Sequence, residues 1–143
     1  MKLSSISLIA AALASIAGSA IAAPPLTPLQ QHVALAKHNQ DARDAHGHAF
    51  FTNQNAQTVT GKHQKYQPKM DEHSAKYAEH GGASERHLAS ARERNPQPPH
   101  DFEGSVQKAL KSQGKANASQ NKASLDIQHA TGGRHPYPDH YKN

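Results

Sequence analysis

The sequence predicts a mostly α-helical chain of several short amphipathic helices joined by flexible loops rich in Pro, Gly and Asn, with substantial disorder and no stable compact core. Apolar residues recur three and four positions apart in several segments, which is the spacing of a helix face. No segment alternates β-branched and polar residues as a strand does. Leu, Ile, Val and Phe make up only 13 of the 121 residues that follow position 22, and chains with less than about 20% of these residues tend to stay disordered.

The first 22 residues have the pattern of a secretory signal peptide. Met1 and Lys2 form a short basic start, an apolar run continues to Ile21, and Ala20-Ile21-Ala22 supplies the small-x-small pattern that signal peptidases recognise. We expect cleavage after Ala22, so that Ala23 begins the mature chain. No second apolar run follows. The sequence therefore predicts a secreted, extracellular protein with no transmembrane segment in its mature part.

Three helices are predicted in the first half of the mature chain. Thr27 is a suitable N-cap with Pro28 at the first helical position, and this helix is expected to end between Ala45 and Phe50. The amide-rich segment 52–67 is predicted to be a loop. A second helix is predicted from Pro68 to the Gly81-Gly82 pair. A third, short helix is predicted to follow, capped by Ser84 and ending before Pro96.

Proline and glycine set the boundaries in the second half. The segment 95–100, with the sequence NPQPPH, is predicted to be a stiff linker. Asp101 is expected to cap a fourth helix that ends near Gly114, and a weaker fifth helix is expected over 115–130. The predicted organisation is a signal peptide (1–22), a His/Ala-rich helical region (23–94), the Pro-rich linker (95–100), a weak helical region (101–130) and a disordered tail (131–143).

Composition excludes several classes of chemistry. The chain has no cysteine, so disulfides, thiolate zinc sites and a cysteine nucleophile are excluded.

The formal charge of +5 falls to +4 without Lys2, and protonation of all 12 histidines would raise it to about +16 in acid. Such a surface attracts acidic partners. No basic stripe interleaved with aromatic residues is visible, so we expect no specific nucleic-acid binding.

Histidine is the residue type that could carry a metal site. His73, His80 and His87 recur at intervals of seven residues, about 10.5 Å along a helix, whereas zinc needs each nitrogen at about 2.0–2.1 Å. These three could therefore share an ion only across helices or across copies of the chain. No motif requires a cofactor. The histidines could bind a divalent metal ion (Zn, Cu, Ni or Fe), and the candidate ligands are His46, His48, His73, His80 and His87. Two other interpretations stay open: the histidines are polar helix-surface residues, or they switch charge with pH.

The sequence indicates no enzyme. It contains no GxSxG elbow, no HExxH pair and no Gly-rich phosphate loop, and no catalytic residues are predicted. The one processing signal besides the signal peptide is Asn117-Ala118-Ser119, which makes Asn117 a candidate glycosylation site.

Three functional hypotheses follow. The first is a small secreted non-enzymatic interaction protein, a microbial effector that acts on a host protein partner, with translocation into the host cell as an open alternative. The second is extracellular metal binding by the histidines, and the third is a cationic antimicrobial that acts in acidic surroundings. The residues expected to dock a partner are apolar positions of the first and fourth predicted helices: Leu29, Val33, Phe102, Val106 and Leu110.

Overall fold

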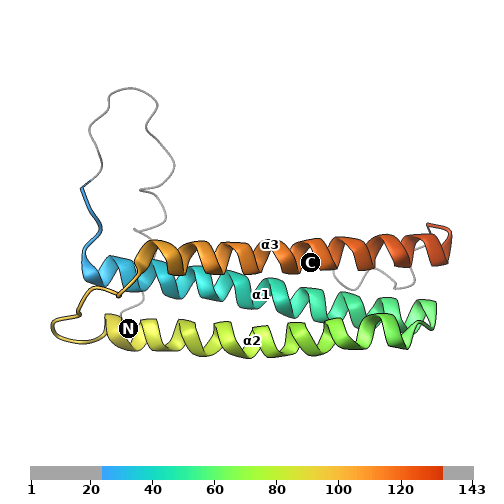
Figure 1. Cartoon of the computed structure of the whole chain (residues 1–143), viewed down its shortest axis with the longest axis horizontal. Helices are drawn as coiled ribbons and strands as arrows, with labels where there is room; N and C mark the ends of the chain where they lie inside the picture. The colour runs from blue at the N-terminus through green and yellow to red at the C-terminus, as the bar shows by residue number, and fades with distance from the viewer. Residues whose placement is uncertain (1–23, 134–143) are drawn as a thin grey trace, which may run out of the picture.

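The computed structural model describes residues 24–133, which form three long helices (Figure 1). Their bounds are α1 (Pro28–Thr60), α2 (His63–Ala91) and α3 (Phe102–Thr131). The described residues contain no strand, so the predicted mostly α-helical class is confirmed. The predicted signal peptide with its cleavage site at Ala22 and Ala23, and the end of the predicted tail (134–143), lie outside the described residues.

The helices form an up-down-up bundle in which α1 packs against both of its neighbours (Figure 1). A tight turn at Gly61, whose backbone is left-handed (φ 67°), reverses the chain between α1 and α2. The longer connection 92–101, which contains the predicted linker, reverses it again before α3. As a result α1 and α3 run parallel and α2 runs antiparallel to both. None of the described helices is long and apolar enough to cross a membrane.

The predicted lack of a compact core is wrong for the described residues. The interior contains only three large side chains that are apolar or largely so (Leu35, Tyr66 and Met70), together with eight alanines. Ala45 and Ala49 of α1 pack on Ala116 of α3. At the far end of the bundle Ala56, Tyr66 and Ala123 form a second cluster, one residue from each helix. A count of large apolar residues misses such a core, because small side chains let helices approach closely and bury backbone atoms as well.

A seven-residue repeat places these alanines and several polar residues in the interior. On α1, eight of the ten buried positions alternate between steps of three and four residues: His32, Leu35, Asn39, Ala42, His46, Ala49, Asn53 and Ala56. Buried residues of α2 include His73 and His80, and those of α3 are spaced by seven at Ala109, Ala116 and Ala123. This is the pattern of helices that wind around one another. Its unusual feature is that alternate layers of the interior are polar.

The helices are longer than the sequence predicted. The predicted loop 52–67 is wrong, because α1 continues to Thr60 and α2 already begins at His63. The amide-rich stretch stays helical because Asn53 is fully buried and donates to Ser119 Oγ of α3 at 3.1 Å. Tertiary contact of this kind outweighs the weak helix propensity of Asn and Thr.

The predicted helix end at Gly81-Gly82 is also wrong. Helix α2 passes through both glycines and absorbs the third predicted helix. His80 and Ser84, on either side of the pair, are both buried, and Ser84 Oγ donates to the Ala36 carbonyl of α1 at 3.0 Å. These contacts offset the cost of glycine inside a helix, about 1 kcal/mol per residue.

The two weak helices predicted after the linker are a single helix. Asp101 is its N-cap, as the sequence indicated, and its side chain accepts from the Gly104 N–H at 2.9 Å. The helix does not stop at Gly114 and ends only at Gly132, whose φ is 60°. Alanines spaced by seven residues on both sides of Gly114 (Ala109, Ala116 and Ala123) are all buried, and the latter two pack on α1.

Candidate functional site

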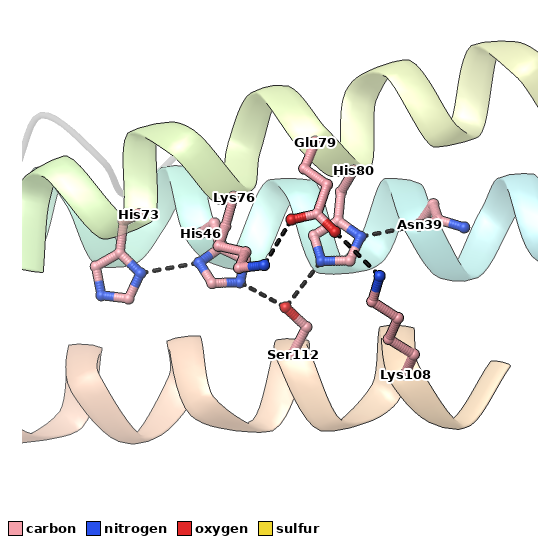
Figure 2. A network of polar contacts seen from close by, with 8 residues as sticks. All are labelled: Asn39, His46, His73, Lys76, Glu79, His80, Lys108 and Ser112. Carbon is pink, nitrogen blue, oxygen red and sulfur yellow. Dashed lines mark hydrogen bonds and ion pairs between the residues drawn. The ribbon is translucent and has the colours of Figure 1, made fainter. Parts of the chain in front are cut away.

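The most distinctive feature of the interior is a row of three histidines contributed by two helices (Figure 2). His46 of α1 lies between His73 and His80 of α2, and all three are at most 3% exposed. The His46 and His80 rings stack with centroids 5.8 Å apart, and the His46 and His73 centroids are 5.1 Å apart. The interval of seven residues between His73 and His80, two helical turns, is what places one histidine on each side of His46.

Hydrogen bonds join this row into one continuous chain, the histidine chain, which crosses all three helices. His46 Nδ1 lies 2.8 Å from His73 Nδ1, and His46 Nε2 lies 3.0 Å from Ser112 Oγ of α3. Ser112 Oγ is also 2.8 Å from His80 Nε2. The chain ends in an asparagine at each side: His80 Nδ1 lies 2.8 Å from Asn39 Oδ1, and His73 Nε2 reaches Ser119 Oγ, which in turn is 3.1 Å from Asn53 Nδ2.

For neutral rings, the orientation of Asn39 fixes the direction of every bond in the histidine chain. Asn39 Nδ2 donates to the Leu35 carbonyl at 2.9 Å, so its oxygen faces His80 and must accept from His80 Nδ1–H. His80 Nε2 is then an acceptor and takes the Ser112 hydroxyl proton, while Ser112 Oγ accepts from His46 Nε2–H. At the other end, Asn53 Nδ2 donates to Ser119 Oγ.

The roles of the remaining three imidazole nitrogens follow in the same way. His46 Nδ1 carries no proton and accepts from His73 Nδ1–H, so His73 Nε2 accepts from the Ser119 hydroxyl. Each imidazole therefore donates once and accepts once, which is the capacity of the neutral ring. With all three rings neutral, one set of tautomers satisfies all the bonds.

The electrostatics of the interior favour the same uncharged state. Burial lowers the pKa of His46 to about 4, and repulsion from His73 and His80 acts in the same direction. Burial also lowers the pKa of His73 and of His80, more strongly than Glu72 or Glu79 nearby raises it. Three adjacent imidazoles in a dry interior penalise the first added proton by desolvation and the next by charge repulsion.

A second histidine contact closes the end of the bundle near the α2–α3 connection. His32 Nε2 donates to the Gln97 carbonyl at 2.9 Å, so His32 Nδ1 is the acceptor that faces His87 Nδ1 at 3.1 Å. Burial and the neighbouring His32 lower the pKa of His87. This pair, like the histidine chain, is complete when both rings are neutral.

A groove of about 250 Å³ lies over the middle of the histidine chain, between α2 and α3. Its floor includes His46, His80 and Ser112. Glu79 lies at its rim between Lys76 of its own helix, at 2.5 Å, and Lys108 of α3, at 3.2 Å (Figure 2). Hydrogen bonds from these two lysines lower the pKa of Glu79 to about 2. The other lining residues are Glu72, Lys111 and Lys115.

Ser112 and His80 of the groove floor form a Ser–His–Asn relay with the buried Asn39 behind them. Its order of contacts is that of a nucleophile, a base and an orienting group. Two features work against acyl transfer at this place. Ser112 Oγ already accepts from His46, and Ser112 lies in the middle of α3, where the backbone N–H groups are bonded within the helix. No pair of free N–H groups beside it can therefore receive an oxyanion.

The five histidines predicted as metal ligands are only partly brought together. His46, His73 and His80 meet in the interior, but every one of their ring nitrogens takes part in the hydrogen bonds given above. His87 pairs with His32 instead, and His48 is exposed. Among residues 24–133, no group of three or more His, Cys, Asp or Glu side chains is arranged to hold a metal ion. A metal bound at His46 would have to displace these hydrogen bonds first.

The predicted docking and modification residues lie on the outer parts of the bundle. Leu29 and Leu110 are exposed, whereas Val33, Phe102 and Val106 are half-buried. Because α1 and α3 run parallel, all five belong to the same half of the bundle. Asn117 is exposed on α3, but the Ser119 of its sequon faces the interior, where it bonds to His73 and Asn53.

Sequence reasoning missed the polar partners of the histidines: Asn39, Asn53, Ser112, Ser119 and His32. A signal for them was present. His32, Asn39, His46 and Asn53 are spaced by seven residues, as are Ser112 and Ser119 on α3. Polar residues that repeat in phase with alanines at the same interval indicate a polar layer within a helical bundle. No protein-family model matches this sequence, and no curated protein or solved structure shows significant similarity to it.

Proposed function

We propose that this protein is a small, exported, non-enzymatic interaction protein whose helical bundle is closed at neutral pH and opens in acidic surroundings. The observation that carries this proposal is the histidine chain, in which the buried rings of His46, His73 and His80 complete their hydrogen bonds while all three are neutral. This combines the interaction protein that the sequence predicts with a charge switch made of its histidines. A host partner and an effector role stay predictions from the sequence.

Protonation acts directly on the contacts that join the helices. A proton added to His46 Nδ1 points at the N–H of His73, and a proton added to His80 Nε2 points at a hydroxyl that must then turn away. Each added proton therefore places a charge in the interior and forces the neighbouring donors and acceptors to rearrange. The cost of such a change in a dry interior is several times that of losing one exposed bond.

The interface between α2 and α3 is the one that depends most on these bonds. Apart from Tyr66, which packs with Ala123, the side-chain contacts described between the two helices are polar. The α1–α3 interface also has the alanine contacts. Acidification is therefore expected to separate α2 from α3 first. It would then expose helices rich in lysine and histidine, which suit an acidic partner.

Some charged groups around the histidine chain raise the pKa of the buried histidines and others lower it. Glu72 and Glu79 of α2 favour protonation of the buried histidines, and Lys76 of α2 and Lys108 of α3 oppose it. Glu79 is already neutralised by these two lysines through its ion pairs. The preference of the three rings for the neutral form therefore comes mainly from burial, which is the largest cause of their lowered pKa.

The absence of cysteine allows a direct test of this opening. Cysteines placed at the exposed positions Ala75 of α2 and Ala118 of α3 can carry spin labels without competing thiols. We expect the distance between the labels to lengthen between pH 7.5 and pH 5. An unchanged distance down to pH 4.5 would refute the proposal.

Two substitutions serve as matched controls for the same measurement. His46→Gln keeps one donor and one acceptor but cannot titrate, so opening should move to lower pH. His63→Gln removes an exposed histidine at the start of α2 and should leave the transition unchanged. The non-enzymatic part of the proposal is tested separately with a fluorophosphonate probe, which should leave Ser112 unlabelled.

A further inference from the structure

Lysines from two helices flank the groove between α2 and α3 along much of its length, and we name this arrangement the lysine track. The members on α2 are Lys65, Lys69 and Lys76, and those on α3 are Lys108, Lys111, Lys115 and Lys122. The ends are tied together: Lys65 pairs with Asp126 of α3 at 2.6 Å, and Lys108 with Glu79 of α2 at 3.2 Å. Lys69 lies close to Lys122. Burial is the largest cause of the lowered pKa of Lys69, and repulsion from Lys122 lowers this pKa further.

The lysine track holds a charge excess as large as that of the whole mature chain. Seven lysines face three carboxylates, Glu72, Glu79 and Asp126, which leaves an excess of four positive charges. The formal charge of the chain without Lys2 is also +4. Elsewhere, positive and negative side chains balance. Among the described residues, Lys111 and Lys115 have no ion-pair partner, although they lie one helical turn apart on α3.

The dimensions of the lysine track fit an extended ligand. From Lys108 to Lys122 the rise along α3 is about 21 Å. Positive charges stand on both sides of the groove over this length, and its central part has a volume of about 250 Å³. A compact ion would contact only two or three of these lysines, whereas a linear chain of repeated negative charges could contact all of them.

The side chains of the lysine track also limit the class of polyanion. Neither arginine nor Phe, Tyr or Trp lines the described groove, and the His46 and His80 rings on its floor are buried, so it lacks the exposed stacking platforms that single-stranded nucleic acids use. Lysine ammonium groups are compact point charges on flexible stems, which pair with carboxylates or sulfates without demanding one geometry. We propose that the lysine track binds a linear acidic polysaccharide that carries a carboxylate or sulfate on successive sugar units. This site belongs to the closed bundle and does not depend on the acid opening proposed above.

Calorimetric titration of residues 23–143 at pH 7.5 tests this inference under conditions in which the bundle is closed. Oligogalacturonate of about twelve units is the carboxylate probe, and dextran sulfate is the sulfate probe. We expect saturable binding that weakens as salt is added. Neutral dextran of the same length should not bind. Tighter binding of a single-stranded oligonucleotide or of an oligoglutamate peptide would overturn the polysaccharide assignment.

A pair of double variants separates the site from general charge attraction. Lys111→Gln with Lys115→Gln should weaken oligogalacturonate binding at least tenfold. Lys37→Gln with Arg92→Gln removes the same charge from positions outside the lysine track and should change affinity less than twofold. Equal losses in both double variants, or no saturable binding by the parent chain, would overturn the proposal. Thermal melts confirm that both variants are folded.

Discussion

His46 Nδ1 and His73 Nδ1 lie 2.8 Å apart, and this contact between two ring nitrogens exists only while one of them carries a proton and the other does not. The position of the proton on each of these two rings is set by the other contacts of that ring. His46 is bound to Ser112 and His73 to Ser119, and for neutral rings the orientation of Asn39 fixes the order of donors and acceptors. The interior of this bundle therefore favours one protonation state of its histidines as well as one packing arrangement of its helices.

The first prediction concerns the pH dependence of stability. The folded pKa of His46, about 4, lies below the reference value of 6.5, so the unfolded chain binds more protons between these pH values. The contribution of His46 is fully present above pH 6.5 and is lost as the pH falls toward 4. We expect the free energy of unfolding to fall by about 3 kcal/mol from this residue alone. Urea unfolding followed by circular dichroism at several pH values measures the slope.

His73, His80 and His87 should steepen this fall, because the pKa of each is also lowered by burial. The control is the exposed His100, whose replacement by Gln should leave the slope unchanged. Stability that is flat between pH 7 and pH 5 would contradict the prediction.

The second prediction concerns Ser112, the one side chain that joins His46 to His80. Ser112→Ala leaves the N–H of His46 and the acceptor nitrogen of His80 buried without their partner. Each unsatisfied group costs roughly 1–3 kcal/mol, so the variant should be among the most destabilising serine substitutions in the chain. The matched control is Ser74→Ala on the exposed side of α2, which should be neutral or slightly stabilising because alanine favours helix. Equal melting temperatures for the two variants would show that Ser112 is not a required link.

The third prediction concerns the alanine layers. Ala49 is fully buried against Ala45 and Ala116. Ala49→Leu adds three carbons where two helices meet and should destabilise the bundle by about 1–3 kcal/mol, despite the greater hydrophobicity of leucine. Ala118→Leu on the exposed side of α3 is the control and should have little effect. A more stable Ala49→Leu protein would mean that the helices are held together less closely than described.

The sequence predicted the helical class and several helix starts, but not the lengths of the helices or the existence of a core. Thr27 and Asp101 act as N-caps as expected, because capping depends on a few neighbouring residues. The prediction of a loop over 52–67 and of a break at Gly81-Gly82 rested on local propensity. Buried contacts of Asn53, His80 and Ser84 with other helices override that propensity, and such contacts are not visible in a local window.

The candidate site was also predicted only in part, because a local stretch of sequence does not show which residues of different helices come into contact. The interval of seven residues between His73 and His80 was visible in the sequence. Their partner His46 was predicted as a candidate metal ligand alongside His48, which the structure places on the exposed surface. The serines and asparagines that complete the chain have no distinguishing chemistry of their own. They become part of a site only because α1, α2 and α3 bring them within 3.1 Å of a shared partner.

The last prediction concerns the two glycines inside α2. Both have helical backbone, and an added Cβ would meet only flexible side-chain atoms: Arg43 Cδ at 3.5 Å from position 81 and an Arg86 guanidinium nitrogen at 3.4 Å from position 82. Gly81→Ala and Gly82→Ala should therefore each stabilise the protein by about 0.5–1 kcal/mol, because alanine loses less backbone entropy in a helix. The control is Gly61→Ala, which places a side chain at φ 67° and should destabilise by a similar amount. Thermal melting decides the sign at each position, and a loss of stability at both 81 and 82 would mean that α2 is broken there.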